Sequence, residues 1–127
     1  MDRTTENRPS ERLGSVSMEQ VIRGIDPVIR SLIPMFLEHS LIRIQGLDEA
    51  LNKGDVSTIK KLAHTMKGSS SSYGFSAIAT VAREIEDVVR QENPELSHLN
   101  ALVADLYALY EAAQAVVIDQ PELFQDS

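Results

Sequence analysis

The chain has 127 residues, 43% of them hydrophobic and 24% charged, a composition typical of one soluble globular domain rather than of a disordered or fibrous chain. The absence of cysteine excludes disulfides, thiolate metal sites and cysteine nucleophiles, and it fits a reducing, cytoplasmic location. The net charge of -7 argues against general binding to nucleic acid or to an anionic membrane, because such binding requires clustered lysine and arginine.

The N-terminal segment is polar and charged, so we expect residues 1–16 to be a flexible lead and not a signal peptide. No run approaches the roughly 18 to 20 apolar residues of a membrane span, and we expect none. One helical domain is expected over residues 17–118, followed by a short C-terminal tail at 119–127.

A short first helix is predicted by a capping-box pattern. Ser17 is followed three residues later by Gln20, which predicts a helix over residues 18–24 that ends at Gly24. Its apolar residues are Met18, Val21 and Ile22, and Ile25 follows directly after it.

A longer helix is predicted over residues 27–52, because Asp26 is a good N-cap and Pro27 is favoured at the first helical position. Pro34 lies inside this helix and removes one backbone hydrogen bond, so we expect it to kink or divide the helix. The core face carries Ile29, Ile33, Phe36, Ile44, Leu47 and Leu51. A second apolar stripe beside it consists of Val28, Leu32, Met35 and Ile42. Its simplest interpretation is that the short first helix packs on it.

A third helix is predicted over residues 56–72. Gly54 ends the preceding helix, and Asp55 caps this one. Tyr73 and Gly74 then turn the chain.

Ser76 is expected to cap a helix over residues 77–91, and Asn93 with Pro94 to open a last helix that reaches about residue 117. Apolar residues recur at helical spacing in both helices. They are Ile78, Val81, Ile85, Val88 and Val89 in the first, and Leu96, Leu99, Val103, Leu106, Tyr110, Ala113 and Val117 in the second. The charged residues expected outside the first stripe are Arg83, Glu84, Glu86, Asp87 and Arg90. The linkers are short, which predicts an all-α fold: an antiparallel up-down four-helix bundle with a short extra N-terminal helix.

His64 is expected to point to solvent. At about 100° per residue it lies about 160° from Met66, which marks the core face of the 56–72 helix. Its nearest surface neighbours are Lys60, Lys67 and Gly68. Glycine inside a helix costs about 1 kcal/mol relative to alanine, and we interpret Gly68 as leaving one side of the imidazole open to a large partner. Neutral imidazole is a nucleophile at physiological pH, and the lysines can neutralise the charge of a phosphoryl group.

Residues 56–83 contain no acidic residue, although the chain has 19. The basic residues within this window are Lys60, Lys61, Lys67 and Arg83. Such a positive island suits one small anion rather than a polyanion, whereas the plain alternative is chance clustering on a solvated face. Ser71 lies on the same outer half of the helix as His64.

The string AHTMKGSSSSYGF, residues 63–75, resembles the signature of histidine-containing phosphotransfer (HPt) domains. The matching positions are, in order, His64, Met66, Lys67, Gly68, Ser70 and Gly74. Met66 departs from the family pattern, in which leucine is more usual, but the two side chains have similar volumes. The likeness extends loosely over residues 26–115.

The resemblance implies that His64 accepts a phosphoryl group from the aspartate of one receiver domain and passes it to the aspartate of another. Lys67 would neutralise the charge of that group, and Gly68 would give steric access; Lys60, Lys61 and Ser71 are secondary candidates. The expected protein is a monomeric phosphoryl carrier of a two-component phosphorelay, without kinase or nucleotide-binding activity. Its expected partners are receiver domains of response regulators or a hybrid sensor histidine kinase. No cofactor of its own is expected, since the receiver would bring magnesium. If the first helix leaves part of the second apolar stripe open, a receiver helix would dock there.

Other sites and classes have less support. His39 and His98 lack the lysine and glycine neighbours of His64, and the three histidines share no metal-ligand spacing. The serines at 69–72 lack the glycine pattern of a phosphate-binding loop, and Lys60 and Lys61 are plausible as simply solvated side chains. No acid pair, metal cluster or nucleotide motif indicates a metabolic enzyme. The serious alternative is a helical adaptor that binds a receiver domain or a sensor kinase without taking phosphate.

Overall fold

The computed structural model describes residues 17–125, so the predicted N-terminal lead and the last two residues of the predicted tail lie outside the described part. Between these bounds the chain is helical and contains no β-strand. The elements are α1 (Met18–Arg23), α2 (Pro27–Arg30), α3 (Ile33–Lys53), α4 (Val56–Ser72), α5 (Ser76–Val89), α6 (Leu96–Asp119) and the 3-10 helix η2 (Pro121–Phe124).

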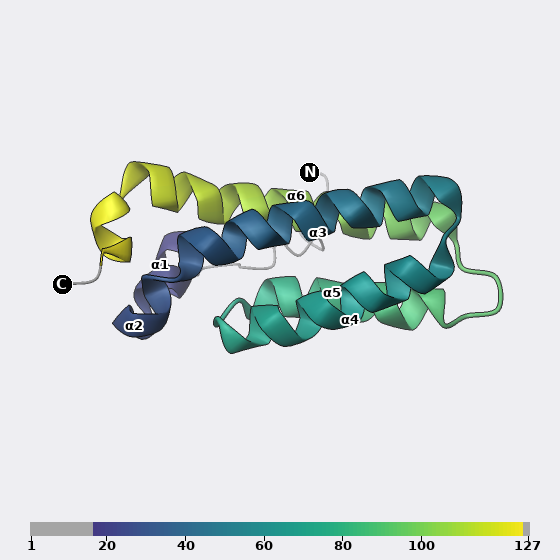
Figure 1. Ribbon diagram of the computed structural model, residues 1–127, viewed down its shortest axis with the longest axis horizontal. Helices are drawn as coiled ribbons and strands as arrows, with labels where there is room; N and C mark the ends of the chain where they lie inside the picture. Colours follow the sequence, from purple (N-terminus) through teal and green to yellow (C-terminus); the bar gives the residue numbers. More distant parts are fainter. Residues whose placement is uncertain (1–16, 126–127) are drawn as a thin grey trace, which may run out of the picture.

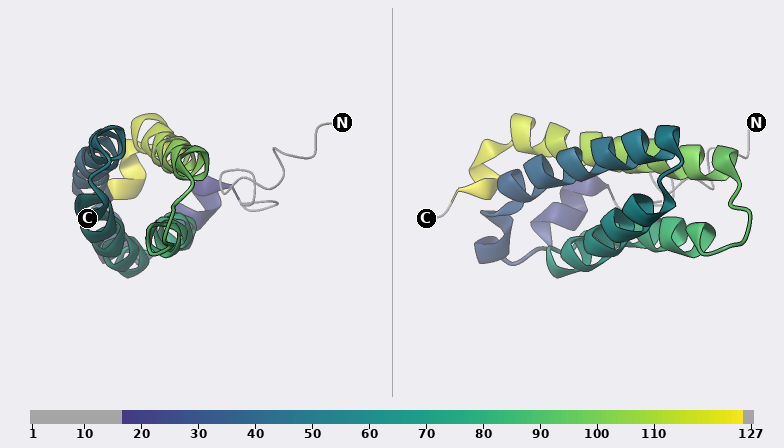
Figure 2. Two further views of the ribbon diagram at one scale, coloured as in Figure 1. Left: turned by 90° about the vertical axis from the view of Figure 1, so that its right-hand side faces the viewer. Right: turned by 45° about the vertical axis from the view of Figure 1, so that its right-hand side comes forward.

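Helices α3 to α6 form an antiparallel four-helix bundle (Figure 1). Each of them packs on its neighbour in the chain, and α6 closes the bundle against α3. Figure 2 shows on its left, in the view along the bundle, that the four helices are arranged around a common axis, and their buried apolar side chains form one core. The predicted fold class is therefore confirmed.

The caps of the early helices are those that the sequence predicts. The Ser17 side chain accepts a hydrogen bond from the Gln20 N–H, and the Gln20 side chain accepts one from the Ser17 N–H. Asp26 and Asp55 accept backbone hydrogen bonds at the starts of α2 and α4. Gly54 ends α3 with a φ of 68°, a left-handed conformation that favours glycine.

Pro34 divides the predicted 27–52 helix, as expected. The first piece, α2, ends at Arg30, and α3 begins at Ile33. The proline therefore lies in the first turn of α3, where its missing N–H needs no helical partner.

The predicted N-caps of the last two helices are wrong. Ser76 is the first residue of α5 rather than its cap, and α6 begins at Leu96, beyond Asn93. The residue before α5 is Phe75, which is 2% exposed and stacks on Phe36 with ring centroids 5.2 Å apart. The start of α5 therefore has no side-chain cap, and a buried aromatic ring occupies the N-cap position.

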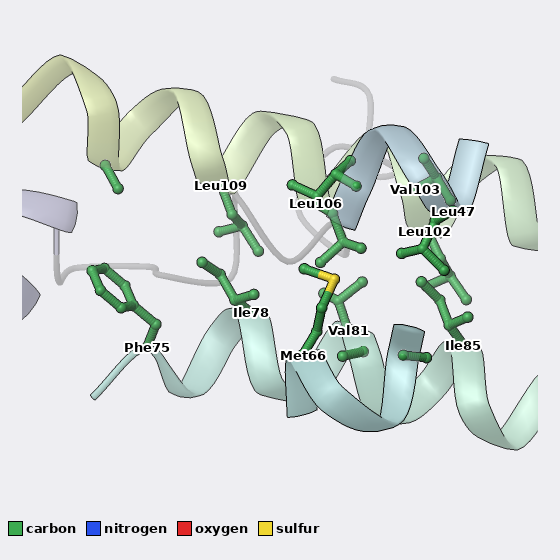
Figure 3. Packing of buried hydrophobic residues seen from close by; sticks show 14 of the residues in the cluster. Leu47, Met66, Phe75, Ile78, Val81, Ile85, Leu102, Val103, Leu106 and Leu109 are labelled. Carbon is green, nitrogen blue, oxygen red and sulfur yellow. The ribbon is translucent and has the colours of Figure 1, made fainter. Parts of the chain in front are cut away.

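Aliphatic side chains from all four bundle helices fill the core (Figure 3). All five predicted core residues of α5 are buried, whereas Leu96, predicted for the core stripe of α6, is 60% exposed. It is the first residue of α6, where the bundle ends.

The length and composition of α6 alone would allow it to cross a membrane, although no membrane span was expected from the sequence. Its buried residues join the common core, where α6 packs against α3 and α5.

The interpretation that the first helix covers the second apolar stripe is wrong. Met18 and Ile22 of α1 are buried in the main core, and α1 packs on α6 instead. The stripe residues remain exposed, with exposed fractions of 69% for Val28, 47% for Leu32, 60% for Met35 and 65% for Ile42. We call these four residues the α2–α3 stripe.

The predicted tail is partly structured. Residues 121–124 form η2, and Phe124 is buried in the common core. The Arg23 guanidinium donates a hydrogen bond of 2.7 Å to the Gln120 side chain, which ties α1 to the end of α6.

Candidate functional site on α4 and α5

His64 projects outward from the middle of α4, as predicted. Its side chain is 69% exposed, whereas Ala63 and Met66, close to it in sequence, are fully buried. The helix thus anchors one face in the core and presents the imidazole on the other.

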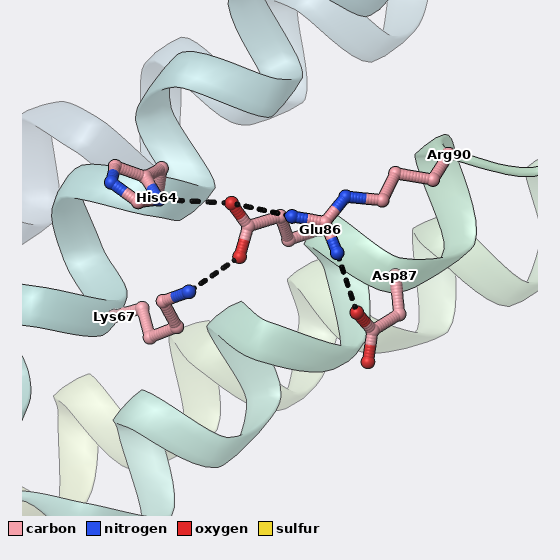
Figure 4. A network of polar contacts seen from close by, with 5 residues as sticks. All are labelled: His64, Lys67, Glu86, Asp87 and Arg90. Atoms are coloured by element: carbon pink, nitrogen blue, oxygen red, sulfur yellow. Dashed lines mark hydrogen bonds and ion pairs between the residues drawn. The ribbon is translucent and has the colours of Figure 1, made fainter.

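Glu86 of α5 holds the imidazole from one side (Figure 4). Its Oε2 atom lies 2.9 Å from His64 Nδ1, and the Glu86 side chain is only 4% exposed. An ionised carboxylate can only accept hydrogen bonds, so Nδ1 carries the proton and donates it. In the neutral ring the free lone pair is then on Nε2, the nitrogen that Glu86 does not hold.

Two cations share the Glu86 carboxylate with His64. Lys67 Nζ donates to Oε1 at 2.8 Å, and Arg90 Nη2 lies 3.5 Å from Oε2. The pKa of Glu86 is lowered, mainly by the hydrogen bond from Lys67 and also by His64 and the charge of Arg90, which together outweigh its burial. The carboxylate is therefore ionised at neutral pH. Arg90 in turn contacts Asp87, with Nη1 at 3.4 Å from Oδ1.

Gly68 lies one turn after His64 on the outer face of α4. A Cβ atom built on it would meet no other atom within 4 Å outside its own helix turn. The structure therefore places no packing demand on this glycine. Glycine lowers the stability of the helix at this position, and it leaves the surface beside the imidazole bare.

The secondary candidates do not join the Glu86 network. Lys60 and Lys61 are exposed on α4. The pKa of Asp55 is lowered mainly by hydrogen bonds from Thr58, and the charge of Lys61 adds a smaller effect. The charge of Lys61 therefore interacts with the residue that caps α4 and not with the Glu86 carboxylate. Ser71 is exposed and lines a surface hollow together with Lys67.

The role of Glu86 was not expected from the sequence, because this residue was predicted to lie outside the apolar stripe of α5. Glu86 is 3% exposed, and that prediction is wrong. The available signal was spacing, because Ala79 and Ala82 precede Glu86 by seven and four residues and share its side of the helix. Two small buried residues followed by an acid mark the edge where α5 approaches α4 closely.

Metal binding has no support within residues 17–125, where no three His, Cys, Asp or Glu side chains come together to hold an ion. His39 lies on α3 and His98 on α6, and both are exposed. The structure therefore brings together His64, Lys67 and Gly68, as predicted, and adds Glu86 and Arg90.

Comparison with known proteins identifies a family for this chain. No curated protein and no solved structure matches the chain. A family model described as the Hpt domain matches residues 31–116, more than half of the chain, and this range contains His64 and Glu86. Hpt domains are helical phosphocarrier modules of two-component signalling. The chain therefore belongs to the Hpt domain family.

Proposed function

We propose that this chain relays a phosphoryl group between the aspartates of receiver domains in a two-component phosphorelay, with His64 as its carrier. The observation that carries the proposal is an exposed imidazole whose Nδ1 is held by a buried carboxylate at 2.9 Å. That contact leaves Nε2 as the nucleophile and fixes the ring on one side.

The transfer step is a displacement at phosphorus. The Nε2 lone pair of His64 attacks the phosphorus of an aspartyl phosphate, the bond from phosphorus to the carboxyl oxygen breaks, and the aspartate carboxylate leaves with the bonding electrons. Nδ1 keeps its proton, because the Glu86 carboxylate accepts it in a hydrogen bond before and after the step. The same contact favours the protonated phosphoimidazole, from which neutral imidazole departs when the group is passed on.

Lys67 is the candidate for neutralising the charge of the transferred group. Its side chain is 34% exposed and its Nζ lies 2.8 Å from Glu86, so the ammonium is already held next to the ring. If the Lys67 ammonium turned toward the phosphoryl oxygens, Arg90 would remain to balance the charge of the Glu86 carboxylate.

The receiver partner is proposed to dock over the bare surface at Gly68 and over part of the α2–α3 stripe. Helices α3 and α4 pack on each other, and the four exposed apolar side chains of the stripe have no cover in the described part of the chain. Apolar contact of this kind suits a helix of the partner. The partner would be a receiver domain of a response regulator or of a hybrid sensor kinase.

The partner would supply the components of the reaction that this chain lacks. Magnesium would come from the receiver, and no kinase or nucleotide-binding activity is assigned to this chain. We propose that it acts as a monomer in the cytoplasm.

Glu86 is proposed as a positioning residue for His64. We expect Glu86→Ala to slow phosphorylation of His64 by the small donor phosphoramidate about tenfold, because the ring loses the acceptor that fixes its tautomer and orientation. Glu86→Gln should recover most of this rate, since its amide oxygen still accepts from Nδ1. The two rates are followed by phosphate-affinity gel electrophoresis. Equal rates for wild type and Glu86→Ala would contradict the positioning role.

The competing function is an adaptor that binds a receiver or a kinase without taking phosphate. The two functions separate when the protein is incubated with a receiver domain phosphorylated with labelled phosphate. The relay predicts that acid-labile label moves to this chain, and an adaptor would bind the receiver while the label stays on it.

A further inference from the structure

A surface hollow of about 380 Å³ lies between α4 and α5 next to the His64 site. Its lining residues are Lys67 and Ser71 of α4 and Ser76, Ala79, Thr80 and Arg83 of α5. We call it the α4–α5 groove. Lys67 belongs both to this groove and to the Glu86 network, so the groove directly adjoins the phosphoryl site.

Among the described residues, the lining of the groove carries positive charge and no acid. Lys67 and Arg83 are cationic, and three of the other four side chains end in hydroxyls that can donate hydrogen bonds. All six lining residues come from the acid-free window of residues 56–83. Helices α4 and α5 pack against each other, so the two halves of that window lie side by side. The fold thus brings together cationic residues that are far apart in the sequence.

Arg83 is the lining cation that forms no ion pair with a carboxylate of the described residues 17–125. Its side chain is exposed. Lys67, in contrast, is paired with Glu86. An exposed guanidinium presents a planar pair of donors that matches a carboxylate, and it adds little to the stability of the fold in this position.

We propose that the α4–α5 groove receives a side-chain carboxylate of the docking receiver domain, with Arg83 as its principal contact. This inference rests on the proposed function. The chain as a whole carries a charge of -7, whereas the charged residues that line the groove are cations, so the groove attracts a carboxylate against the net charge of the chain. Because the groove adjoins Lys67, a carboxylate seated there sets the position of the receiver relative to His64.

An isolated phosphate ion is a weaker occupant. The groove is open to solvent, and none of its charged or hydroxyl side chains is buried. Exposed cations of this kind act mainly on the rate and register of association rather than on tight binding of a free ion.

The test compares Arg83→Glu with the control Lys53→Glu, which makes the same change of charge at the far end of α3. At low salt we expect Arg83→Glu to raise the KM for the phosphorylated receiver about tenfold with little change in kcat, and Lys53→Glu to change it less than about twofold. The difference should disappear near 1 M salt, where the screening length is about 3 Å. A receiver in which one surface acid beside its active site is changed to lysine should restore transfer to Arg83→Glu.

Three results would overturn the groove proposal: an unchanged KM for Arg83→Glu at low salt, an equal effect of Lys53→Glu, or inhibition of wild type by millimolar inorganic phosphate that Arg83→Gln abolishes. The last result would make the groove a site for free phosphate. Phosphorylation by phosphoramidate separates this test from the proposed function, because the small donor needs no docking. Wild type and Arg83→Glu should react equally with it, and a wild type that takes no phosphate from either donor would reject the relay itself.

Discussion

Replacement of His64 by glutamine is expected to remove all acid-labile phosphate from the protein while leaving its fold intact. The side chain is 69% exposed, and the glutamine amide can replace its hydrogen bond to Glu86 with one of its own. Glutamine has no nucleophilic lone pair comparable to that of imidazole. The measurement is transfer of label from a phosphorylated receiver, with circular dichroism and the melting temperature as checks of folding.

The control for His64→Gln is the same substitution at His98. This histidine is exposed on α6, away from the proposed docking surface, and its substitution should leave the transfer rate within about twofold of wild type, because it does not touch the Glu86 network. Label that persists in His64→Gln, or that is lost in His98→Gln, would show that the phosphoryl group is carried elsewhere.

Replacement of Gly68 by glutamine is expected to slow transfer from a phosphorylated receiver about 100-fold, because the added side chain keeps the partner's aspartyl phosphate from the distance and line of attack that the reaction needs. The same change should stabilise the protein by up to about 1 kcal/mol, since glutamine is the better helix former and a Cβ at this position meets nothing within 4 Å. Slower transfer together with higher stability would identify Gly68 as a residue kept for access to His64.

Two further reactions make the Gly68 test specific. Phosphorylation by phosphoramidate should change less than about threefold, because a small donor still reaches Nε2 past the glutamine. Gly68→Ala should fall between wild type and Gly68→Gln in transfer from the receiver. An undiminished rate with Gly68→Gln would refute the steric explanation for this glycine.

The outward direction of His64 could be predicted because it depends only on the period of one helix. Met66 and Ile59 mark the buried face of α4, and the position of His64 on the helix follows from the residue count. The starts of α1, α2 and α4 could be predicted for a similar reason, since their caps are local hydrogen bonds within four residues.

The burial of Glu86 could not be predicted in the same way. Whether a charged residue at the edge of an apolar stripe is exposed depends on how closely the next helix approaches and on what that helix offers. Here α4 brings Lys67 and His64 to the carboxylate, and these partners offset the cost of burying it. The exposure of the α2–α3 stripe likewise depends on where α1 packs, and no local sequence pattern specifies that position.

The most direct test of the account is to determine which imidazole nitrogen of His64 bears the phosphoryl group. The protein, labelled with 15N in histidine, is phosphorylated by its receiver and studied by 31P and 15N NMR. The account predicts one phosphorus bonded to Nε2, with the Nδ1 proton retained opposite Glu86. Phosphorus on Nδ1, or on any residue other than His64, would contradict it.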